Sequence, residues 1–383
     1  MLNKTETGKG RLSMKKKIFM AIGMIAIIVL GAFVYLNVSD TKHKKVRIGV
    51  ILPLTGNGAI YGATMRHGIE LAHNNDPTNR VELLFEDDAG DARTGVSAYN
   101  SLTFRGINII IGGAMSHVAS ALLPLSNRDR TLLLSPNATN PNLRNIENDL
   151  FFRIWPTDDV DGKIMPKYIK ESLPDVRRVA IFYPNVDYGV GIMKAFLKNL
   201  ENSDIEIVFN EGYQLGHTDF RTQILRIRQQ NPDLLFMPGY FAEAVVILRQ
   251  LNELGCDFYV AGVSSFFEND IINAAGNLRD RTFFSYPLFS ADSKNPRTQN
   301  FIESFRQRHG ETPGAFAAYA YDSYNVIRQA ISVLDNNKKE ITPENLRDAL
   351  KSLEIINGVT GDYTFDENGD AIKDLQIIWL RDI

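Results

Sequence analysis

The sequence predicts an α/β protein built on parallel β-sheets, because strand-like and helix-like segments alternate along most of its 383 residues. The strand-like segments are short apolar runs, and the segments between them repeat apolar residues with the period of a helix. The chain is longer than one ordinary domain, so we expect two lobes. A hydrophobic fraction of 44% is sufficient for a substantial core in each.

The elements follow one another from residue 46. We expect strands at 46–52, 81–86, 107–111, 131–134, 178–183, 205–209, 233–236, 257–261 and 282–286. Helical periodicity lies between them, for example at 93–105, 188–201, 218–230 and 241–254. Further helices are expected at 296–309, 315–335 and 343–352, then a hairpin through 366–369 into a last strand at 376–380. Because that strand follows three helices, it must join a sheet begun much earlier.

The first 45 residues carry a membrane signal. Residues 18–36 form a 19-residue run without a charged side chain, preceded by three lysines at 15–17. This length suits a membrane-spanning helix, and the preceding positive charges predict that residues 1–17 stay in the cytoplasm. A cleaved signal peptide is the alternative, although the run is longer than usual and no small-residue cleavage site follows it. We expect a retained single-pass anchor in the cytoplasmic membrane, a tether at 37–45 and an exported body.

Charge and motifs narrow the function of the body. Residues 46–383 carry 33 Lys and Arg against 43 Asp and Glu, and a net charge of −10 argues against a nucleic-acid surface. The sequence contains no nucleophile elbow, Walker loop or HExxH motif. The six histidines and the single Cys256 show no metal-ligand spacing. We therefore expect no catalytic residue, no metal and no cofactor.

Small or hydroxylated residues follow two strands that we expect to be neighbours. Ser116 comes shortly after the strand at 107–111, and Thr139 comes shortly after the strand at 131–134. Ligands of α/β sheets bind at the carboxyl ends of strands, and a helix beginning at Ser116 would favour an anion. The natural guest is a small molecule with a carboxylate. The alternative, that both hydroxyls only cap helices, stays open at this point.

Glycines at 56, 58 and 62 lie between a strand and a helix, and three acids at 86–88 end the next strand. This arrangement is similar to a dinucleotide-binding fingerprint, but its G-x-G-x-x-x-G spacing is one residue too long. We instead interpret the loop as one that lets a ligand approach the backbone, with Tyr61 over it.

Several short segments of residues 46–383 follow the order seen in a known family. They are VRIGVILPLTG at 46–56, YG at 61–62, EDD at 86–88, IG at 111–112, SPNATNP at 135–141, DYG at 187–189, PGY at 238–240 and FDENG at 365–369. Together they resemble the Leu/Ile/Val-type solute-binding proteins of ABC importers. The resemblance implies the type I periplasmic-binding fold, with two Rossmann-like lobes joined by three crossovers. Lobe one would comprise 46–157 and 289–372, and lobe two 158–288 and 373–383.

The resemblance also implies a ligand site between the lobes. Lobe one would hold the head group of an amino acid with the hydroxyls of Ser116 and Thr139 and the backbone of Asn137 and Ala138. Three further positions resemble the aromatic residues that cover the ligand, namely Tyr61 from the first loop and Tyr188 and Tyr240 from lobe two.

One position departs from the family pattern. Members that bind α-amino acids usually carry an acid after the strand that ends here near residue 262, where it pairs with the ligand's ammonium group. Ser264 stands in that region of this sequence, and the nearest acid is Glu268. A buried ammonium group without an anionic partner is costly. An amino acid and a carboxylate or amide without the amine are therefore both open as ligands.

The function implied by the resemblance is that of a solute-binding receptor, not an enzyme. It would capture an amino acid or a related small carboxylate or amide, and deliver it as a monomer to an ABC permease in the cytoplasmic membrane. The alternative is a membrane-anchored ligand sensor or regulatory scaffold with the same fold. The stub at 1–17 is too short for an output domain, which favours transport.

Overall fold

The computed structural model describes residue 19, residues 45–201 and residues 203–383. The expected cytoplasmic stub, anchor and tether therefore lie outside the described residues, apart from residues 19 and 45. Within the described part of the chain, no helix is long and apolar enough to cross a membrane. Residues 46–383 form one compact unit, and the description below concerns that unit alone.

The first sheet has five parallel strands in the order β2-β1-β3-β4-β5. They are β1 (Val46–Leu52), β2 (Val81–Asp87), β3 (Ile109–Gly112), β4 (Leu132–Ser135) and β5 (Phe151–Arg153). The helices between them are α2 (Ala59–Asn74), α3 (Ala92–Phe104) and α4 (Ser116–Arg128). β3 and β4 are buried along their whole length, which explains why their sequences are unbroken apolar runs.

The second sheet has six strands in the order β13-β10-β9-β8-β6-β7. They are β6 (Arg178–Pro184), β7 (Glu206–Tyr213), β8 (Leu234–Phe236), β9 (Tyr259–Gly262), β10 (Thr282–Pro287) and β13 (Leu375–Trp379). All pair in parallel except β13, which lies antiparallel to β10. The helices of this half are α5 (Asp158–Ser172), α6 (Asp187–Leu200), α7 (Arg221–Gln229), α8 (Phe241–Glu253) and α9 (Asn269–Ala275).

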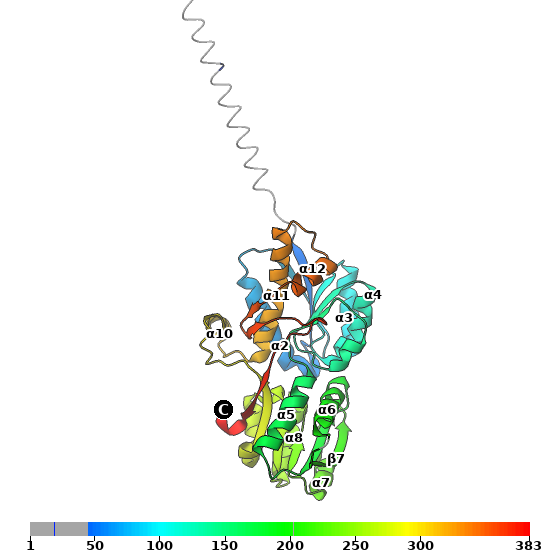
Figure 1. The fold of residues 1–383 in the computed structure, drawn as a ribbon, viewed down its shortest axis with the longest axis vertical. Coiled ribbons are helices and arrows are strands. Elements are labelled where there is room, and N and C mark those ends of the chain that lie inside the picture. Colours follow the sequence, from blue (N-terminus) through cyan, green and yellow to red (C-terminus); the bar gives the residue numbers. More distant parts are fainter. Residues whose placement is uncertain (1–18, 20–44, 202) are drawn as a thin grey trace, which may run out of the picture. The chain divides into compact units, whose positions relative to one another are not determined.

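The chain passes between the two sheets three times. It leaves the first sheet after β5, returns after β10, and leaves again before β13. Between the last two passages lie α10 (Pro296–His309), α11 (Ala315–Asn336) and α12 (Pro343–Lys351). They pack on the first half: α10 and α11 contact α2, and α12 contacts β4. Figure 1 shows α11 beside α2. The predicted α/β fold with two largely parallel sheets and three crossovers is confirmed.

The predicted hairpin turn through 366–369 is present: Phe365 and Ala371 form an antiparallel bridge across it, and Ile372 N–H donates to Thr364 O. A further hairpin, which the sequence did not predict, joins β11 (Ile356–Gly358) to β12 (Gly361–Tyr363). The turn at 366–369 lies against β5, where Arg153 N–H donates to Gly369 O and forms an ion pair with Asp370. This ion pair attaches the turn to the first sheet. The chain then continues to β13, which pairs with β10 in the second sheet.

The glycine-rich loop closes on protein atoms. Gly56 has a positive φ of 73°, and a side chain at Gly62 would place its Cβ 2.0 Å from Pro53 O. The Asp87 carboxylate accepts hydrogen bonds from Leu54 N–H (2.8 Å) and Thr55 N–H (3.2 Å). The glycines thus serve the packing of the loop against its own chain, which corrects our interpretation that they admit a ligand to the backbone.

Candidate ligand-binding site

A cavity with about 570 Å³ of empty space, its mouth included, lies between the carboxyl ends of the two sheets. Its lining comes from the segments that follow β1, β3, β4 and β5 in the first sheet and β6, β8 and β9 in the second. Ligands of open α/β sheets bind at such strand ends.

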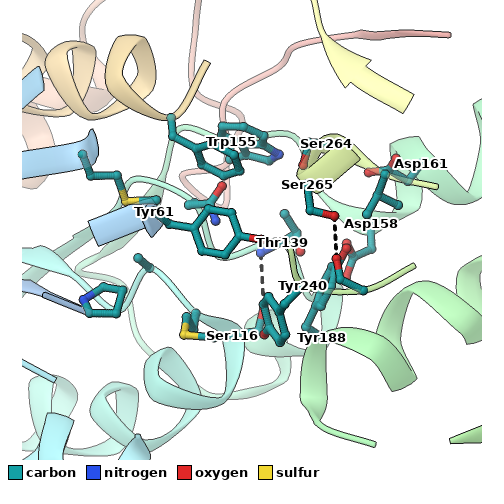
Figure 2. Close-up of a pocket in the computed structure, with 18 residues that line it drawn as sticks. Tyr61, Ser116, Thr139, Trp155, Asp158, Asp161, Tyr188, Tyr240, Ser264 and Ser265 are labelled. Carbon is teal, nitrogen blue, oxygen red and sulfur yellow. Dashed lines mark hydrogen bonds between the residues drawn. The ribbon is translucent and has the colours of Figure 1, made fainter. Parts of the chain in front are cut away.

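The cavity brings together most of the predicted site residues. Seven of them line it, namely Tyr61, Ser116, Asn137, Thr139, Tyr188, Tyr240 and Ser264, and Figure 2 shows how the six other than Asn137 lie. The eighth, Ala138, is fully buried and does not line the cavity. Its backbone N–H donates to Ser135 Oγ at 2.9 Å, so its contribution is to hold the turn after β4 in place.

The two predicted hydroxyls do not cap helices. Ser116 is the first residue of α4, and its Oγ accepts hydrogen bonds from the N–H groups of Thr139 and Asn140, both at 3.3 Å. The residue before it, Met115, makes no side-chain cap to α4. Among the described residues, no side-chain cap closes the N-terminus of α4, as at a helix N-terminus that receives an anion.

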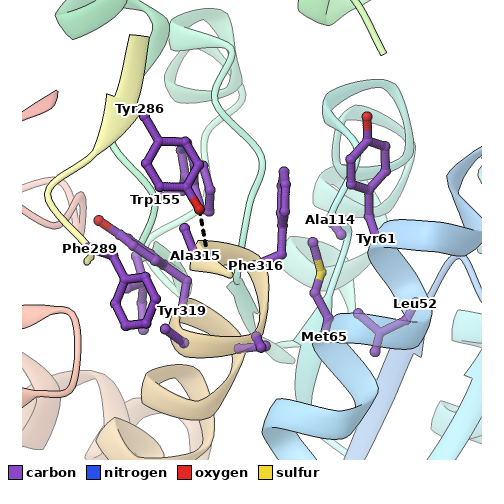
Figure 3. Close-up of a cluster of buried hydrophobic side chains, with 14 of the residues drawn as sticks. Leu52, Tyr61, Met65, Ala114, Trp155, Tyr286, Phe289, Ala315, Phe316 and Tyr319 are labelled. Atoms are coloured by element: carbon purple, nitrogen blue, oxygen red, sulfur yellow. Dashed lines mark hydrogen bonds between the residues drawn. The ribbon is translucent and has the colours of Figure 1, made fainter. Parts of the chain in front are cut away.

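Aromatic rings enclose much of the rest of the cavity. The Tyr188 and Tyr240 rings lie 5.3 Å apart between centroids, and the Tyr61 and Phe316 rings 4.8 Å apart. Trp155 stacks on Phe316 at 5.0 Å, as Figure 3 shows within the buried cluster. Trp155 and Phe316 were not predicted from the sequence. Trp155 stands where the chain leaves the first sheet after β5, and Phe316 stands at the start of α11, and no local pattern marks such positions.

Tyr61 also connects the two halves. It lies on α2 beside the first sheet, and its hydroxyl accepts a hydrogen bond of 2.6 Å from Phe241 N–H, at the start of α8 in the second half. The N-terminus of α8 has no cap from its own chain segment, so Tyr61 provides one from across the cavity. Burial, opposed by this bond, raises the pKa of Tyr61, and the hydroxyl stays protonated.

Two acids in the first turn of α5, Asp158 and Asp161, line the cavity and were not predicted. Asp158 is 0% exposed, and neither of its carboxylate oxygens has a hydrogen-bond partner among the residues that the structure describes. The nearby Thr139 hydroxyl favours the ionised form of the Asp158 carboxyl. Burial and the charge of Asp161 nevertheless raise the pKa of Asp158 well above its usual range. Asp161 accepts a hydrogen bond from Ser285, and burial raises its pKa to about 7.

Ser264 and Glu268 lie in different surroundings. Ser264 lines both this cavity and a second, adjoining one, whereas Glu268 lines the second and not the first, together with Glu311. Burial and the charges of Glu311 and Asp270 raise the pKa of Glu268 to about 7. Within the described ranges, no three His, Cys, Asp or Glu side chains are grouped to hold a metal ion.

Comparisons with known proteins agree with this architecture. A model of the periplasmic binding protein family matches residues 45–381. The Leu/Ile/Val-binding protein homolog 2 of Brucella abortus is 26% identical over 364 residues, which cover 93% of this chain and 94% of that protein. The leucine-, isoleucine-, valine-, threonine-, and alanine-binding protein of Pseudomonas aeruginosa is 26% identical over 351 residues, covering 90% of this chain and 91% of its own.

Solved structures share the fold over the same range. A leucine binding protein from Thermotoga maritima has a TM-score of 0.79 at 26% identity and covers 87% of this chain and 94% of its own. A branched-chain amino acid transporter substrate binding protein from Streptococcus pneumoniae, in complex with isoleucine, has a TM-score of 0.77 at 25% identity, with 88% and 96% covered.

Proposed function

Because the chain belongs to the periplasmic binding protein family, we propose that it is the extracytoplasmic solute-binding receptor of an ABC importer. The observation that carries this proposal is the cavity at the carboxyl ends of both sheets, lined by hydroxyls on one side and by aromatic rings around them. The relatives are named for binding leucine, isoleucine and valine. They support an amino acid or a related small carboxylate or amide as the ligand class.

The first half provides the pole for a carboxylate. Ser116 and Thr139 donate their hydroxyl hydrogens to the ligand oxygens, and the uncapped N-terminus of α4 adds favourable electrostatics. The rings of Tyr61, Tyr188 and Tyr240 then cover the ligand and exclude water. Removing polar groups from water is costly unless they are paired, so these contacts select ligands with matching groups.

The mechanism is closure of two lobes over the ligand, with lobe one at 46–157 and 289–372 and lobe two at 158–288 and 373–383. The three passages of the chain between the sheets act as hinges. The open form binds the solute on lobe one, and closure adds the tyrosines of lobe two. Two tyrosine hydroxyls support a closed arrangement in this conformation, because Tyr61 accepts from Phe241 N–H and Tyr286 accepts from Ala315 N–H.

A retained anchor at residues 18–36 would keep the receptor beside its permease, with the body in the periplasm or extracellular space. The uncharged run and the preceding lysines support this proposal. Mass analysis of the membrane-extracted protein should find residues 14–36 still attached. A new amino terminus between residues 35 and 45 would show that the segment is a cleaved signal.

The receptor function is tested by a thermal-shift screen of the full-length, detergent-solubilised protein. The panel comprises the twenty amino acids, short carboxylates and amides. A true ligand raises the unfolding midpoint, increasingly with its concentration, because it binds only the folded state. Absence of a shift with every member of the panel would contradict the proposal.

A further inference from the structure

Phe104 is the most exposed large apolar side chain of residues 46–383. It is the last residue of α3, and its side chain is 94% exposed. The chain turns directly after it, with Gly106 at a positive φ of 73°. A single exposed ring carries little by itself, so its surroundings decide what covers it.

The ring lies at the end of the first sheet where the strands begin. Because β1 pairs in parallel with both β2 and β3, the segments that precede these strands lie side by side. A Cβ at Gly106 would be 3.5 Å from the Arg47 guanidinium, which places that cation beside the Phe104 turn. The end of α11 belongs to the same face, because Arg80 before β2 forms an ion pair with Asp335.

Positive charge gathers at this end of the first half, which we call the amino-end face. It comprises the segments at the starts of β1, β2 and β3 and at the end of α11, namely 45–47, 75–80, 104–108 and 336–340. They carry six Lys and Arg against two acids, although residues 46–383 as a whole have a net charge of −10. Four of these cations are exposed and form no ion pair with another described residue, namely Lys45, Arg47, Lys338 and Lys339.

The chain enters the first half at this face, because β1 begins at Val46. The proposed tether at 37–45 is all that separates Val46 from the uncharged run at 18–36. Its nine residues reach at most about 30 Å, even when fully extended. A retained anchor would therefore keep the amino-end face within that distance of the lipid.

We propose that the amino-end face rests on the anionic headgroups of the membrane, with Phe104 inserted among them. This inference goes beyond the receptor function and rests on the proposed anchor. An aromatic ring flanked by cations suits the membrane interface, because the ring leaves water while the cations stay beside the lipid phosphates. The anchor supplies a high effective concentration, so the contact needs little affinity of its own. The ligand cavity lies at the opposite, carboxyl ends of the strands and stays open to solvent.

Phe104→Trp tests the contact in the full-length protein reconstituted in lipid nanodiscs. The substitution keeps an aromatic ring, and tryptophan emission reports both polarity and contact with brominated lipid. In discs of brominated phosphatidylglycerol we expect emission at shorter wavelength and strong quenching. In discs of brominated phosphatidylcholine both effects should be much smaller, because the cations need anionic lipid. The wild type, with its two native tryptophans, gives the background.

Leu225→Trp is the matched control. Leu225 is also an exposed apolar residue, 44% accessible, but it lies on α7 in the second half. Figure 1 shows α7 at the end of the second half that points away from α3. The emission of this variant should not be quenched by either lipid.

Charge removal separates the electrostatic part of the contact. Raising the salt concentration from about 0.1 M to 1 M shortens the screening length from about 10 Å to 3 Å, and should release Trp emission at position 104 from quenching. Lys338→Asn, which suits the positive φ of 53° at that position, combined with Lys339→Gln should act similarly at low salt. We expect the ratio of quenched to unquenched emission to fall about tenfold or more.

Three results would overturn the inference. The first is equal quenching at positions 104 and 225, or none at 104. The second is quenching at 104 that is the same in neutral and anionic lipid. The third is a shift to shorter wavelength without quenching, which would mean that protein and not lipid covers the ring.

Failure of the anchor is distinguishable from failure of the surface. Mass analysis of the same sample shows whether residues 18–36 are retained. A protein that lacks them is mixed with the same discs, where selective quenching at position 104 would support the surface alone and its absence would overturn it. The receptor function is measured by the thermal-shift screen and does not depend on either result.

Discussion

Two buried aspartates, Asp322 on α11 and Asp158 on α5, are both hidden from solvent but differ in their hydrogen-bond partners. Asp322 accepts hydrogen bonds from Val359 N–H (2.9 Å), Thr360 N–H (3.0 Å) and the Thr360 hydroxyl. Asp158 accepts none. A carboxylate that its own chain satisfies is part of the fold, whereas one left unsatisfied in a cavity is available to a ligand.

The charge of Lys373, in the segment leading to β13, also acts on Asp322 and favours its ionised form. The Lys373 Nζ donates to Thr360 Oγ1 at 2.5 Å and lies 4.0 Å from the centre of the Tyr363 ring. Burial, partly offset by the Asp322 charge, lowers the pKa of Lys373 to about 8. This network joins α11, the β11–β12 hairpin and the third passage between the sheets.

The largest effect on stability should come from removing the Asp322 carboxylate. Asp322→Ala leaves two buried N–H groups and the Thr360 hydroxyl without their acceptor and removes the charge that favours ionised Lys373. It should lower the free energy of unfolding by about 3–5 kcal/mol. Chemical denaturation measures it. The double variant Asp322→Ala with Lys373→Met removes both charges and should recover part of the loss. A loss below about 1 kcal/mol in the single variant would remove the distinction between the two aspartates.

Asp161 is intermediate, with Ser285 as its one partner, and it predicts a pH dependence. Its folded pKa of about 7 lies above the unfolded value of about 3.9, so the folded protein holds the extra proton between these values. Its contribution to stability is complete below about pH 4 and is lost as the pH rises through 7, by up to about 4 kcal/mol. Denaturation of ligand-free protein across pH 4–8 should show a steeper decline for the wild type than for Asp161→Asn. Parallel curves would contradict the raised pKa.

The sequence predicted some elements of the fold and missed others, for physical reasons. Buried parallel strands such as β3 and β4 appear as apolar runs, so their positions were predicted to within two residues. The short β5 was missed, and so was α5, whose sequence contains Gly162, Pro166 and four charged residues in its first six. Asp158 and Asp161 begin that helix. An acidic first turn is common at any helix N-terminus, so nothing local distinguishes them as cavity residues.

The other site residues also divide into those that the sequence predicts and those that it does not. Ser116 and Thr139 follow predicted neighbouring strands, and parallel pairing of β3 with β4 brings them together. The approach of Trp155 and Phe316 depends instead on two separate passages between the sheets. The closing sequence pattern at 365–369 marks a turn, but its attachment to Arg153 depends on long-range ion pairing that no spacing reveals.

Thr139→Ala tests the proposed carboxylate site, which lies beside Asp158. It removes a hydroxyl donor from the proposed carboxylate site and should weaken binding of a confirmed ligand by about 1.5–3 kcal/mol. The backbone bonds of Thr139 to Ser116 and Asp158 do not involve its side chain, so the fold should persist. Calorimetry measures the change, and unchanged affinity would mean that the turn after β4 is only structural.

The smallest effect on ligand affinity is expected for the hydrogen bond from Phe241 N–H to the Tyr61 hydroxyl, which crosses the cavity. Tyr61→Phe keeps the ring and removes the hydroxyl that accepts from Phe241 N–H. Since this bond joins the two halves, its loss should weaken ligand affinity by about 0.5–1.5 kcal/mol. Tyr99→Phe is the control, because the Tyr99 hydroxyl bonds Thr131 within the first half and should affect stability but not affinity. Equal affinities for wild type and Tyr61→Phe would mean that the hydroxyl contributes nothing to closure, and that the rings alone hold the ligand.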